Sequence, residues 1–304
     1  MIQEASLSQS ENLVKSEKKK LYFSVDLEDF TFDVHRSLGL EPKVNFKALD
    51  KCYERINSFA EDHFNSKKIT FFTTGTVALT YPKLLKRIAD DGHEIACHYH
   101  FHDLMYQHSL QEVESNIVLA REAIKAACGE YPTGFRAPAF SIEQNRGDVY
   151  LLLSKYFKYD SSYVLHDHEI KNGAFKENIP FKIDGFQEFP IITKPWLRKF
   201  NLKSGGTFFR LFNTRNIIGV LNKSLEHGFI PLIYLHPYDF LSEYEFKVSL
   251  KTYISTQNPI KGIYKYLRQF QWLGLGNKGS FKKLKTILLE FEHAGTMNQE
   301  LSKT

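Results

Sequence analysis

The chain has 304 residues, of which 42% are apolar and 25% are charged, enough to bury the core of one large globular domain. No stretch approaches the roughly 20 apolar residues of a membrane span, and the first 20 residues lack the apolar run of a secretory signal. These patterns exclude an integral membrane protein, and a soluble cytoplasmic protein is expected.

Cysteine and charge patterns narrow the classes further. Cys52, Cys97 and Cys128 form no CxxC pair, so free thiols are expected rather than a disulfide framework or a cysteine zinc site. The net charge is +5, and residues 247–285 interleave Lys and Arg with aromatic residues. A solvated face is the simplest interpretation, although such a surface would also suit anionic lipid or an acidic glycan. Nucleic acid is not expected, because the sequence lacks zinc-finger spacing and RNP-like motifs.

Seven short apolar stretches predict β-strands along the chain. They lie at 21–25, 69–72, 93–97, 134–135, 156–159, 186–189 and 231–235. The clearest helix begins at the capping box formed by Ser109 and Glu112 and stops at Gly129, and another spans 82–91. Strands that alternate with helices predict an α/β fold with a mainly parallel sheet.

Polar residues follow most of the predicted strands. Five of them carry reactive or charged side chains: Asp26, His98, Arg136, Asp160 and His236. In α/β barrels the carboxyl ends of the strands converge on one mouth, so residues scattered over more than 200 positions can meet in a single site. Seven strand ends predict a barrel of about seven strands.

The two ends of the chain are expected to lie outside this barrel. Residues 1–19 are polar and predict a disordered lead-in. Within 241–304, helical spacing predicts a closing helix that packs on the barrel through four apolar residues: Leu284, Ile287, Leu288 and Phe291. The predicted division is therefore a lead-in over 1–19, a barrel over 20–240 and an extension over 241–304.

The stretch HEIACHYHFHDL, residues 93–104, holds four histidines in twelve positions. His98 and His102 are four residues apart, at a strand end and in the following turn, a spacing that brings two imidazoles to one side for a metal ion. In the stretch SVDLEDF, Glu28 or Asp29 would supply an oxygen ligand. Two histidines and one carboxylate leave coordination positions open, which is typical of a catalytic zinc site.

Each of these residues also has a purely structural interpretation. A single histidine at a strand end is usually hydrogen-bonded within the fold, the acidic residues of SVDLEDF could cap a helix, and Arg136 could be a buried ion-pair partner. HEIACH is similar to the protease motif HExxH, but its second histidine comes five residues on and the segment is predicted as a strand. His93 and His100 fit the ligand set less well. Joint occurrence at the strand ends favours a metal site.

Five motifs, in this order, resemble those of the polysaccharide deacetylases, the carbohydrate esterases with a NodB-like domain: SVDLEDF, HEIACHYHFH, FRAPAFS, YDSS and YLHPYDF. The resemblance spans about residues 21–240 and implies a distorted seven-stranded (β/α) barrel with a C-terminal helical extension. The opening SVD-x-ED, the stretch EFPI and the stretch GGTFFRLF also resemble a subfamily encoded with exopolysaccharide and capsule assembly genes.

The resemblance implies catalytic roles for four of these residues. Asp26 would be the general base, and Arg136 would orient it. His236 would be the general acid, with Asp160 setting its protonation.

The resemblance also implies one divalent metal ion, expected to be zinc with Co, Ni or Mn as alternatives, bound by His98 and His102. The commonest first motif has two adjacent aspartates, the second of which binds metal, whereas Leu27 intervenes here. Both Glu28 and Asp29 therefore remain candidates for the carboxylate ligand.

The implied reaction is hydrolysis of the N-acetyl group of an amino sugar, with release of acetate. For a cytoplasmic enzyme the expected substrate is an N-acetylated glycan or a lipid-linked sugar at the inner membrane face, with peripheral membrane contact through 247–285. Two alternatives stay open, a hydrolase of another C–N bond, such as a cyclic amide or ureide, and a non-catalytic glycan-binding protein. The joint presence of Asp26, Arg136 and His236 argues against the second, because binding needs no base or acid.

Overall fold

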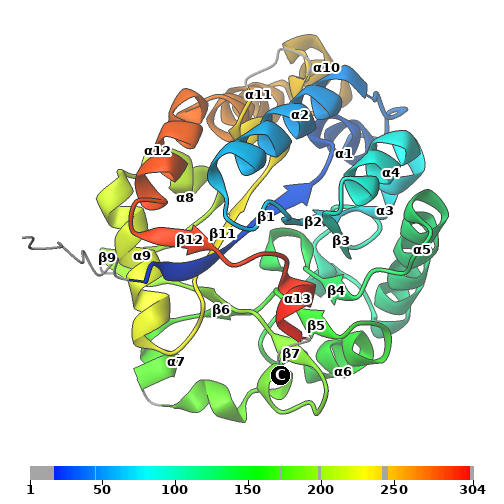
Figure 1. Ribbon diagram of the computed structural model, residues 1–304. Helices are drawn as coiled ribbons and strands as arrows, with labels where there is room; N and C mark the ends of the chain where they lie inside the picture. The colour runs from blue at the N-terminus through cyan, green and yellow to red at the C-terminus, as the bar shows by residue number, and fades with distance from the viewer. Residues whose placement is uncertain (1–16, 45, 172, 198–199, 242–245, 302–304) are drawn as a thin grey trace, which may run out of the picture.

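The computed structural model describes residues 17–44, 46–171, 173–197, 200–241 and 246–301. Its centre is a curled sheet of parallel strands in the order β11-β1-β2-β3-β4-β5-β7, surrounded by helices (Figure 1). These strands are β1 (Lys19–Leu27), β2 (Thr70–Thr73), β3 (Glu94–Cys97), β4 (Gly134–Phe135), β5 (Tyr159–Asp160), β7 (Gln187–Glu188) and β11 (Leu232–Leu235). The predicted distorted seven-stranded (β/α) barrel is confirmed.

Strand β1 lies in the interior of the sheet. It pairs in parallel with β11 on one side and with β2 on the other, and every residue from Leu21 to Leu27 is buried. Continuous burial of this kind is typical of a parallel strand that is covered on both faces. The carboxyl end of β1, which carries Asp26, is therefore held on all sides.

Helices connect the strands and cover the sheet. They are α1 (Phe30–Ser37), α2 (Phe46–His63), α3 (Gly75–Thr80), α4 (Pro82–Asp90), α5 (Leu110–Cys128), α6 (Gly147–Tyr156), α7 (Asp167–Lys171), α8 (Gly206–Leu211) and α9 (Thr214–Glu226). In α5, the Ser109 and Glu112 side chains form the predicted capping box. Gly129, at φ +94°, ends α5 in the left-handed region that glycine adopts without strain.

Short strands are where the sequence prediction was least accurate. The strand predicted at 156–159 was wrong in its first part, because Tyr156 is the last residue of α6, where its hydroxyl donates to Glu114 of α5. Two small sheets were not predicted. Strand β6 (Val164–Leu165) pairs with β8 (Ile191–Ile192), and β9 (Lys194–Leu197) pairs with β10 (Phe200–Leu202). Strands of two to four residues carry too little periodicity to be recognised.

The C-terminal part returns to the start of the sheet. It contains α10 (Leu250–Thr256), α11 (Pro259–Leu273), α12 (Ser280–Ile287), β12 (Phe291–His293) and α13 (Met297–Leu301). The helix predicted to reach Phe291 was wrong at its end, because α12 stops at Ile287 and Phe291 begins a strand that pairs with Lys19 of β1. Of the predicted lead-in 1–19, residues 1–16 lie outside the described residues, and β1 already begins at Lys19.

Two further expectations concern cysteines and membrane spans. Cys52, Cys97 and Cys128 are free thiols, as predicted. Among the described helices, none is long and apolar enough to cross a membrane.

Candidate metal centre and active site

Five predicted site residues lie at one edge of the main sheet. Each ends or directly follows the carboxyl half of a parallel strand: Asp26 (β1), His98 (β3), Arg136 (β4), Asp160 (β5) and His236 (β11). Because these strands are parallel and belong to one curled sheet, their carboxyl ends share one rim. The predicted convergence of residues from distant parts of the sequence is therefore present in the fold.

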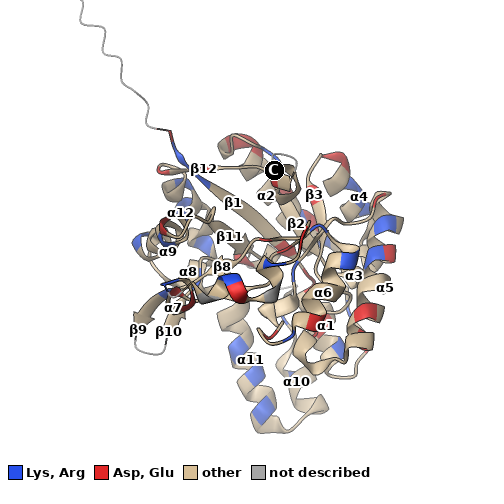
Figure 2. Ribbon diagram, turned by 90° about the horizontal axis from the view of Figure 1, so that it is seen from below, with Lys and Arg blue, Asp and Glu red and all other residues tan. Residues whose placement is uncertain are grey.

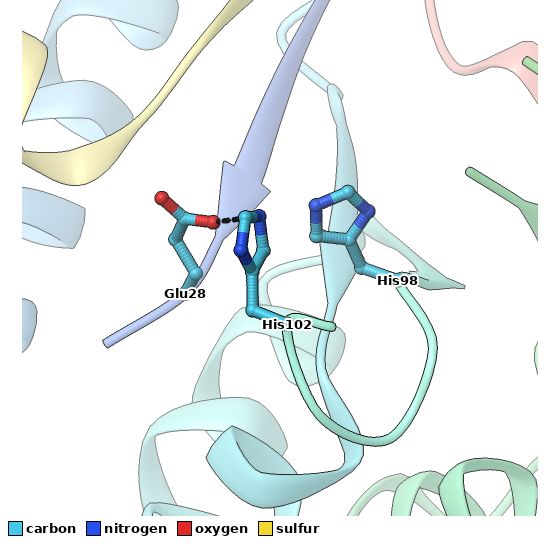
Figure 3. Close-up of side chains that lie close together, drawn as sticks. All are labelled: Glu28, His98 and His102. Carbon is cyan, nitrogen blue, oxygen red and sulfur yellow. Dashed lines mark ion pairs between the residues drawn. The ribbon is translucent and has the colours of Figure 1, made fainter. Parts of the chain in front are cut away.

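Glu28, His98 and His102 form a compact group (Figure 3). One carboxylate oxygen and one ring nitrogen from each histidine all lie within 4.8 Å of one another. Figure 3 shows Glu28 at the end of β1 reaching toward His102, which stands on the loop after β3. His98 Nδ1 lies 2.8 Å from the backbone oxygen of Arg136, a contact that fixes the ring and leaves Nε2 available as a ligand.

The loop that carries His98 and His102 has a strained backbone and is hydrogen-bonded to helix α3. Tyr99 adopts a φ of +68° although it is not glycine, which is uncommon outside functional sites. The backbone oxygens of Tyr99 and His100 accept hydrogen bonds from the N–H groups of Gly75 and Thr76. A Cβ atom at Gly75 would collide with the His100 ring, so only glycine allows this close approach.

The electrostatics of the group fit a bound cation. Burial alone would lower the pKa of His102, but Glu28, Asp33 and Asp26 raise it to about 9, and Glu28 lies only 2.6 Å away. Burial would raise the pKa of Glu28, yet the neighbouring His102, His236 and His98 bring it well below its ordinary value.

Burial lowers the pKa of His98 to about 4, which favours the neutral ring that a metal ligand needs. Glu28 Oε2 is buried and lies 2.6 Å from His102 Nε2. Imidazole nitrogen and carboxylate oxygen are the ligands zinc uses, and three such ligands leave a position open. A divalent ion there would compete with a proton for the His102 ring.

Asp29 lies away from this group, although the sequence left it as an alternative ligand. Its carboxylate caps helix α1 by accepting from the backbone N–H groups of Thr31 and Phe32, and the Tyr81 hydroxyl donates to it. Glu28 is the acidic residue that faces the histidines, so the structure favours Glu28 as the carboxylate ligand.

Asp26 and Arg136 form a buried ion pair beside the metal group. Arg136 Nη1 donates to Asp26 Oδ1 at 2.6 Å and to Ser24 Oγ at 2.9 Å. The other guanidinium nitrogens donate to Ser161, and the guanidinium carbon lies 3.9 Å from the centre of the Phe72 ring. These contacts fix the guanidinium in one orientation, and Asp26 keeps its second oxygen for another partner.

His236 is supported by a residue that the sequence interpretation missed. Asp239 Oδ2 accepts hydrogen bonds from the His236 backbone N–H at 2.8 Å and from Nδ1 at 3.0 Å. Arg210 Nε lies 2.6 Å from the other oxygen of Asp239, and both side chains are buried. Burial alone would lower the pKa of His236, but Glu28, Asp239 and Asp26 raise it to about 9. The spacing of three residues between His236 and Asp239 in YLHPYDF could have indicated this pairing from the sequence.

The stretch GGTFFRLF explains how Arg210 reaches this position. Gly206, at φ +51°, passes so close to His236 that a Cβ atom would lie 3.3 Å from the ring, and a Cβ atom at Gly205 would collide with Tyr234. The two glycines therefore allow α8 to start against β11, and α8 then carries Arg210 to Asp239.

Tyr238 contacts both His236 and the metal ligand candidate Glu28. Its ring stacks on His236 at 4.9 Å between centroids, and its hydroxyl donates to Glu28 Oε1 at 2.5 Å. From the sequence, Tyr238 is a candidate for stacking on a sugar ring; its hydrogen bond to Glu28 was not predicted, because nothing local in the turn indicates which carboxylate the hydroxyl meets.

Among the described residues no hydrogen bond or ion pair joins Asp160 to His236, and the carboxylate on the His236 ring is that of Asp239, so these contacts do not support the predicted role of Asp160 in setting the protonation of His236. Its carboxylate accepts from the backbone N–H and the hydroxyl of Ser162, and Ser162 in turn accepts from the N–H of Ala137, next to Arg136. Burial raises the pKa of Asp160, and burial together with Asp160 raises that of Glu188 on β7 far more. Asp160 thus positions the loop that carries Arg136.

The two remaining histidines of the opening stretch are structural. His93 Nδ1 accepts from the Ile69 N–H, and its Nε2 lies 2.9 Å from Asn57 Oδ1. His100 packs against α3 and stays outside the metal group, as predicted.

Comparisons with known proteins agree with this geometry. Residues 54–153 match the polysaccharide deacetylase family, and residues 161–278 match a domain of unknown function, DUF3473. The peptidoglycan deacetylase-like protein FGM2 of Gibberella zeae is 32% identical over 105 residues, 34% of this chain and 30% of that protein. The peptidoglycan deacetylase of Helicobacter pylori is 32% identical over 98 residues, 32% of this chain and 33% of that protein. The chain thus spans about a third of the length of these curated relatives.

A solved structure shares the fold. A Mycobacterium smegmatis protein assigned to the polysaccharide deacetylases superposes with a TM-score of 0.50, 17% identity and coverage of 94% of both chains. Fold and rim residues together define an α/β barrel with a candidate metal site on its rim. Residues 54–153 are thus similar to the polysaccharide deacetylase family, and the DUF3473 match covers a region that follows them.

Proposed function

We propose that this protein is a metal-dependent deacetylase that hydrolyses the N-acetyl group of an amino sugar within a polysaccharide or its precursor. The observation that carries the proposal is the grouping of Glu28, His98 and His102 on the same rim as the Asp26–Arg136 pair and His236. The names of the relatives, which are peptidoglycan deacetylases, support an N-acetylated glycan as the substrate class.

Glu28, His98 and His102 would hold the metal ion, for which zinc is the proposed choice. When bound, a divalent ion supplies Lewis-acid polarisation of the acetamide carbonyl and lowers the pKa of a bound water toward about 7. Tyr238 Oη and the Arg136 carbonyl keep Glu28 and His98 oriented for this task.

Asp26 is the proposed general base. Arg136 donates a charge-assisted hydrogen bond to Asp26, which fixes the direction of the carboxylate. The Asp26 oxygen that does not face Arg136 is then free to take a proton from the attacking water.

His236 is the proposed general acid. Asp239 accepts a hydrogen bond at Nδ1, so the proton on Nε2 can be delivered to the sugar nitrogen as the C–N bond breaks. The carboxylates around His236 keep the ring protonated at neutral pH, which a general acid needs. Acetate and a free amino sugar result.

The finer parts of the proposal concern substrate and location. We propose a glycan of exopolysaccharide or capsule assembly, on the strength of the motif resemblance alone. The cytoplasmic location stays a prediction.

The test is acetate release from N-acetylated chitooligosaccharides by the purified protein, with and without added zinc and a chelator. We expect zinc-dependent release of acetate with equal amounts of free amine, and no release by Asp26→Asn protein that still binds the metal. Release that continues after complete chelation would contradict the metal-dependent mechanism. Glycan binding without any acetate would instead favour the glycan-binding alternative.

A further inference from the structure

Helices α10 and α11 form a hairpin that projects from the body of the barrel (Figure 2). The two helices pack closely on each other, since a Cβ atom at Gly262 of α11 would lie 2.8 Å from the Tyr253 carbonyl oxygen of α10. The buried residues of α11 are Gly262, Gln269 and Leu273. One face of α11 is therefore used for packing within the protein.

A different face of α11 is apolar and exposed to solvent. Ile260 is 80% exposed, Tyr264 and Leu267 are each 62% exposed, and Ile263 is 46% exposed. Their spacing of three and four residues places them on one stripe of the helix. A soluble helix normally turns only one apolar face to its core, so this second stripe is available for a partner.

The charge around the stripe has a single sign. Residues 246–289 contain no Asp or Glu, and their Lys and Arg residues are Lys247, Lys251, Lys261, Lys265, Arg268, Lys278, Lys282, Lys283 and Lys285. Lys261, Lys265 and Arg268 recur every three or four residues and so flank the apolar stripe on α11. Figure 2 shows these basic positions along α11 and no acidic position on either helix of the hairpin.

We propose that the α10–α11 hairpin docks onto an anionic lipid surface. An apolar stripe bordered by Lys and Arg is the pattern of a helix that lies in the membrane interface, with its apolar side chains among the acyl chains and its cations at the headgroups. Two copies of the hairpin would bring like charges together, which disfavours a second copy as the partner.

The base of the hairpin touches the catalytic rim. Trp272, at the end of α11, packs on Phe30 at 6.2 Å between ring centroids, and Phe30 packs on Tyr238 at 6.1 Å. Arg210, which pairs with Asp239, also donates to the backbone oxygens of Trp272 and Leu275. Docking through the hairpin would therefore hold the rim close to the membrane. If the protein is the proposed deacetylase, membrane docking narrows its substrate to an N-acetylated glycan anchored in that membrane.

Co-sedimentation of the full chain with phosphatidylcholine vesicles, with and without phosphatidylglycerol, tests the docking. We expect binding only to the anionic vesicles, weakened by salt. Lys261→Gln/Lys265→Gln should weaken binding about 25-fold, roughly five-fold for each charge. The matched control is Lys155→Gln/Lys158→Gln, which removes two exposed charges elsewhere on the barrel and should bind nearly as the wild type does.

A second pair of variants tests the apolar stripe. Ile260→Ser/Leu267→Ser should bind anionic vesicles at least ten-fold more weakly, because two large apolar side chains are lost from the interface. Leu119→Ser/Leu151→Ser, on the exposed faces of α5 and α6, are the controls, with similar exposure in the folded protein.

Vesicle binding and catalysis are read out separately. Asp26→Asn should bind vesicles as the wild type does while it releases no acetate. A wild-type protein that binds vesicles but releases no acetate would keep the docking and overturn the proposed function. Equal binding to neutral and anionic vesicles, or unchanged binding by both hairpin variants, would overturn the docking whatever the activity. The wild type could instead form a dimer and not bind vesicles, with the Ile260→Ser/Leu267→Ser variant monomeric. That result would assign the stripe to contact with a second copy of the chain.

Discussion

The metal side and the acid side of the rim are built in different ways. On the metal side, Glu28 comes from the end of one strand and His98 and His102 from a single loop, so two of the three ligands are four residues apart. On the acid side, His236 depends on Asp239 in the next turn and on Arg210 from a separate helix. Residue type and spacing therefore indicate the metal ligands, whereas tertiary contacts control the protonation of His236.

Removing the metal ligands should have the largest effect. His98→Ala/His102→Ala should reduce bound metal from about one ion per chain to almost none and abolish acetate release, because one carboxylate alone holds zinc weakly. Elemental analysis of protein purified without a histidine tag measures this. His168→Ala, an exposed histidine on α7, is the control and should keep its metal. A double variant with full metal content would refute the site.

Removing the base should lower the rate while the metal stays bound. Asp26→Asn keeps the shape of the side chain and a contact with Arg136 but cannot take a proton, so kcat should fall by roughly 10² to 10⁴. Steady-state acetate release, together with metal content, distinguishes this outcome from loss of the metal. An Asp26→Asn protein with wild-type kcat would remove Asp26 from the mechanism.

The role of Asp239 beside His236 should be visible in the dependence of kcat on pH. The Asp239 carboxylate helps to raise the pKa of His236, so Asp239→Asn should lower that pKa, and the protonated acid should be lost at a lower pH. The alkaline limb of kcat against pH should therefore move down by roughly one to three units. Asp160→Asn is the informative control, since Asp160 does not contact His236. A limb that moves in Asp160→Asn but not in Asp239→Asn would restore the original sequence interpretation.

Among these variants, Asp29→Ala should have the smallest effect on activity, and its comparison with Glu28→Gln tests which residue is the metal ligand. Asp29→Ala removes the cap of helix α1, which should lower the free energy of unfolding by about 1 kcal/mol while the metal is retained. Glu28→Gln should instead weaken metal binding and leave the cap intact. Chemical denaturation and metal titration of the two variants measure both quantities. Metal loss in Asp29→Ala, with binding retained in Glu28→Gln, would reverse the assignment.

The sequence by itself located the seven main strands, β5 only in part, together with helix α5 and the rim residues Asp26, His98, Arg136 and His236. Hydrophobic periodicity and capping signals are local, and parallel strands bring their carboxyl ends together whatever the loops between them do. His98 and His102 could be paired because four residues is a distance within one loop.

Only the tertiary structure decided the rest. Glu28 and Asp29 are adjacent acidic residues, and the direction of the chain at the start of α1 turns one toward the histidines and the other toward the helix end. Arg210 and Asp239 are 29 positions apart and meet only because two glycines let α8 approach β11. Phe291 fits a helical pattern, yet it pairs with Lys19, some 270 residues away. Long-range contacts of this kind leave no periodic trace, because nothing local in the chain records which distant residue completes them.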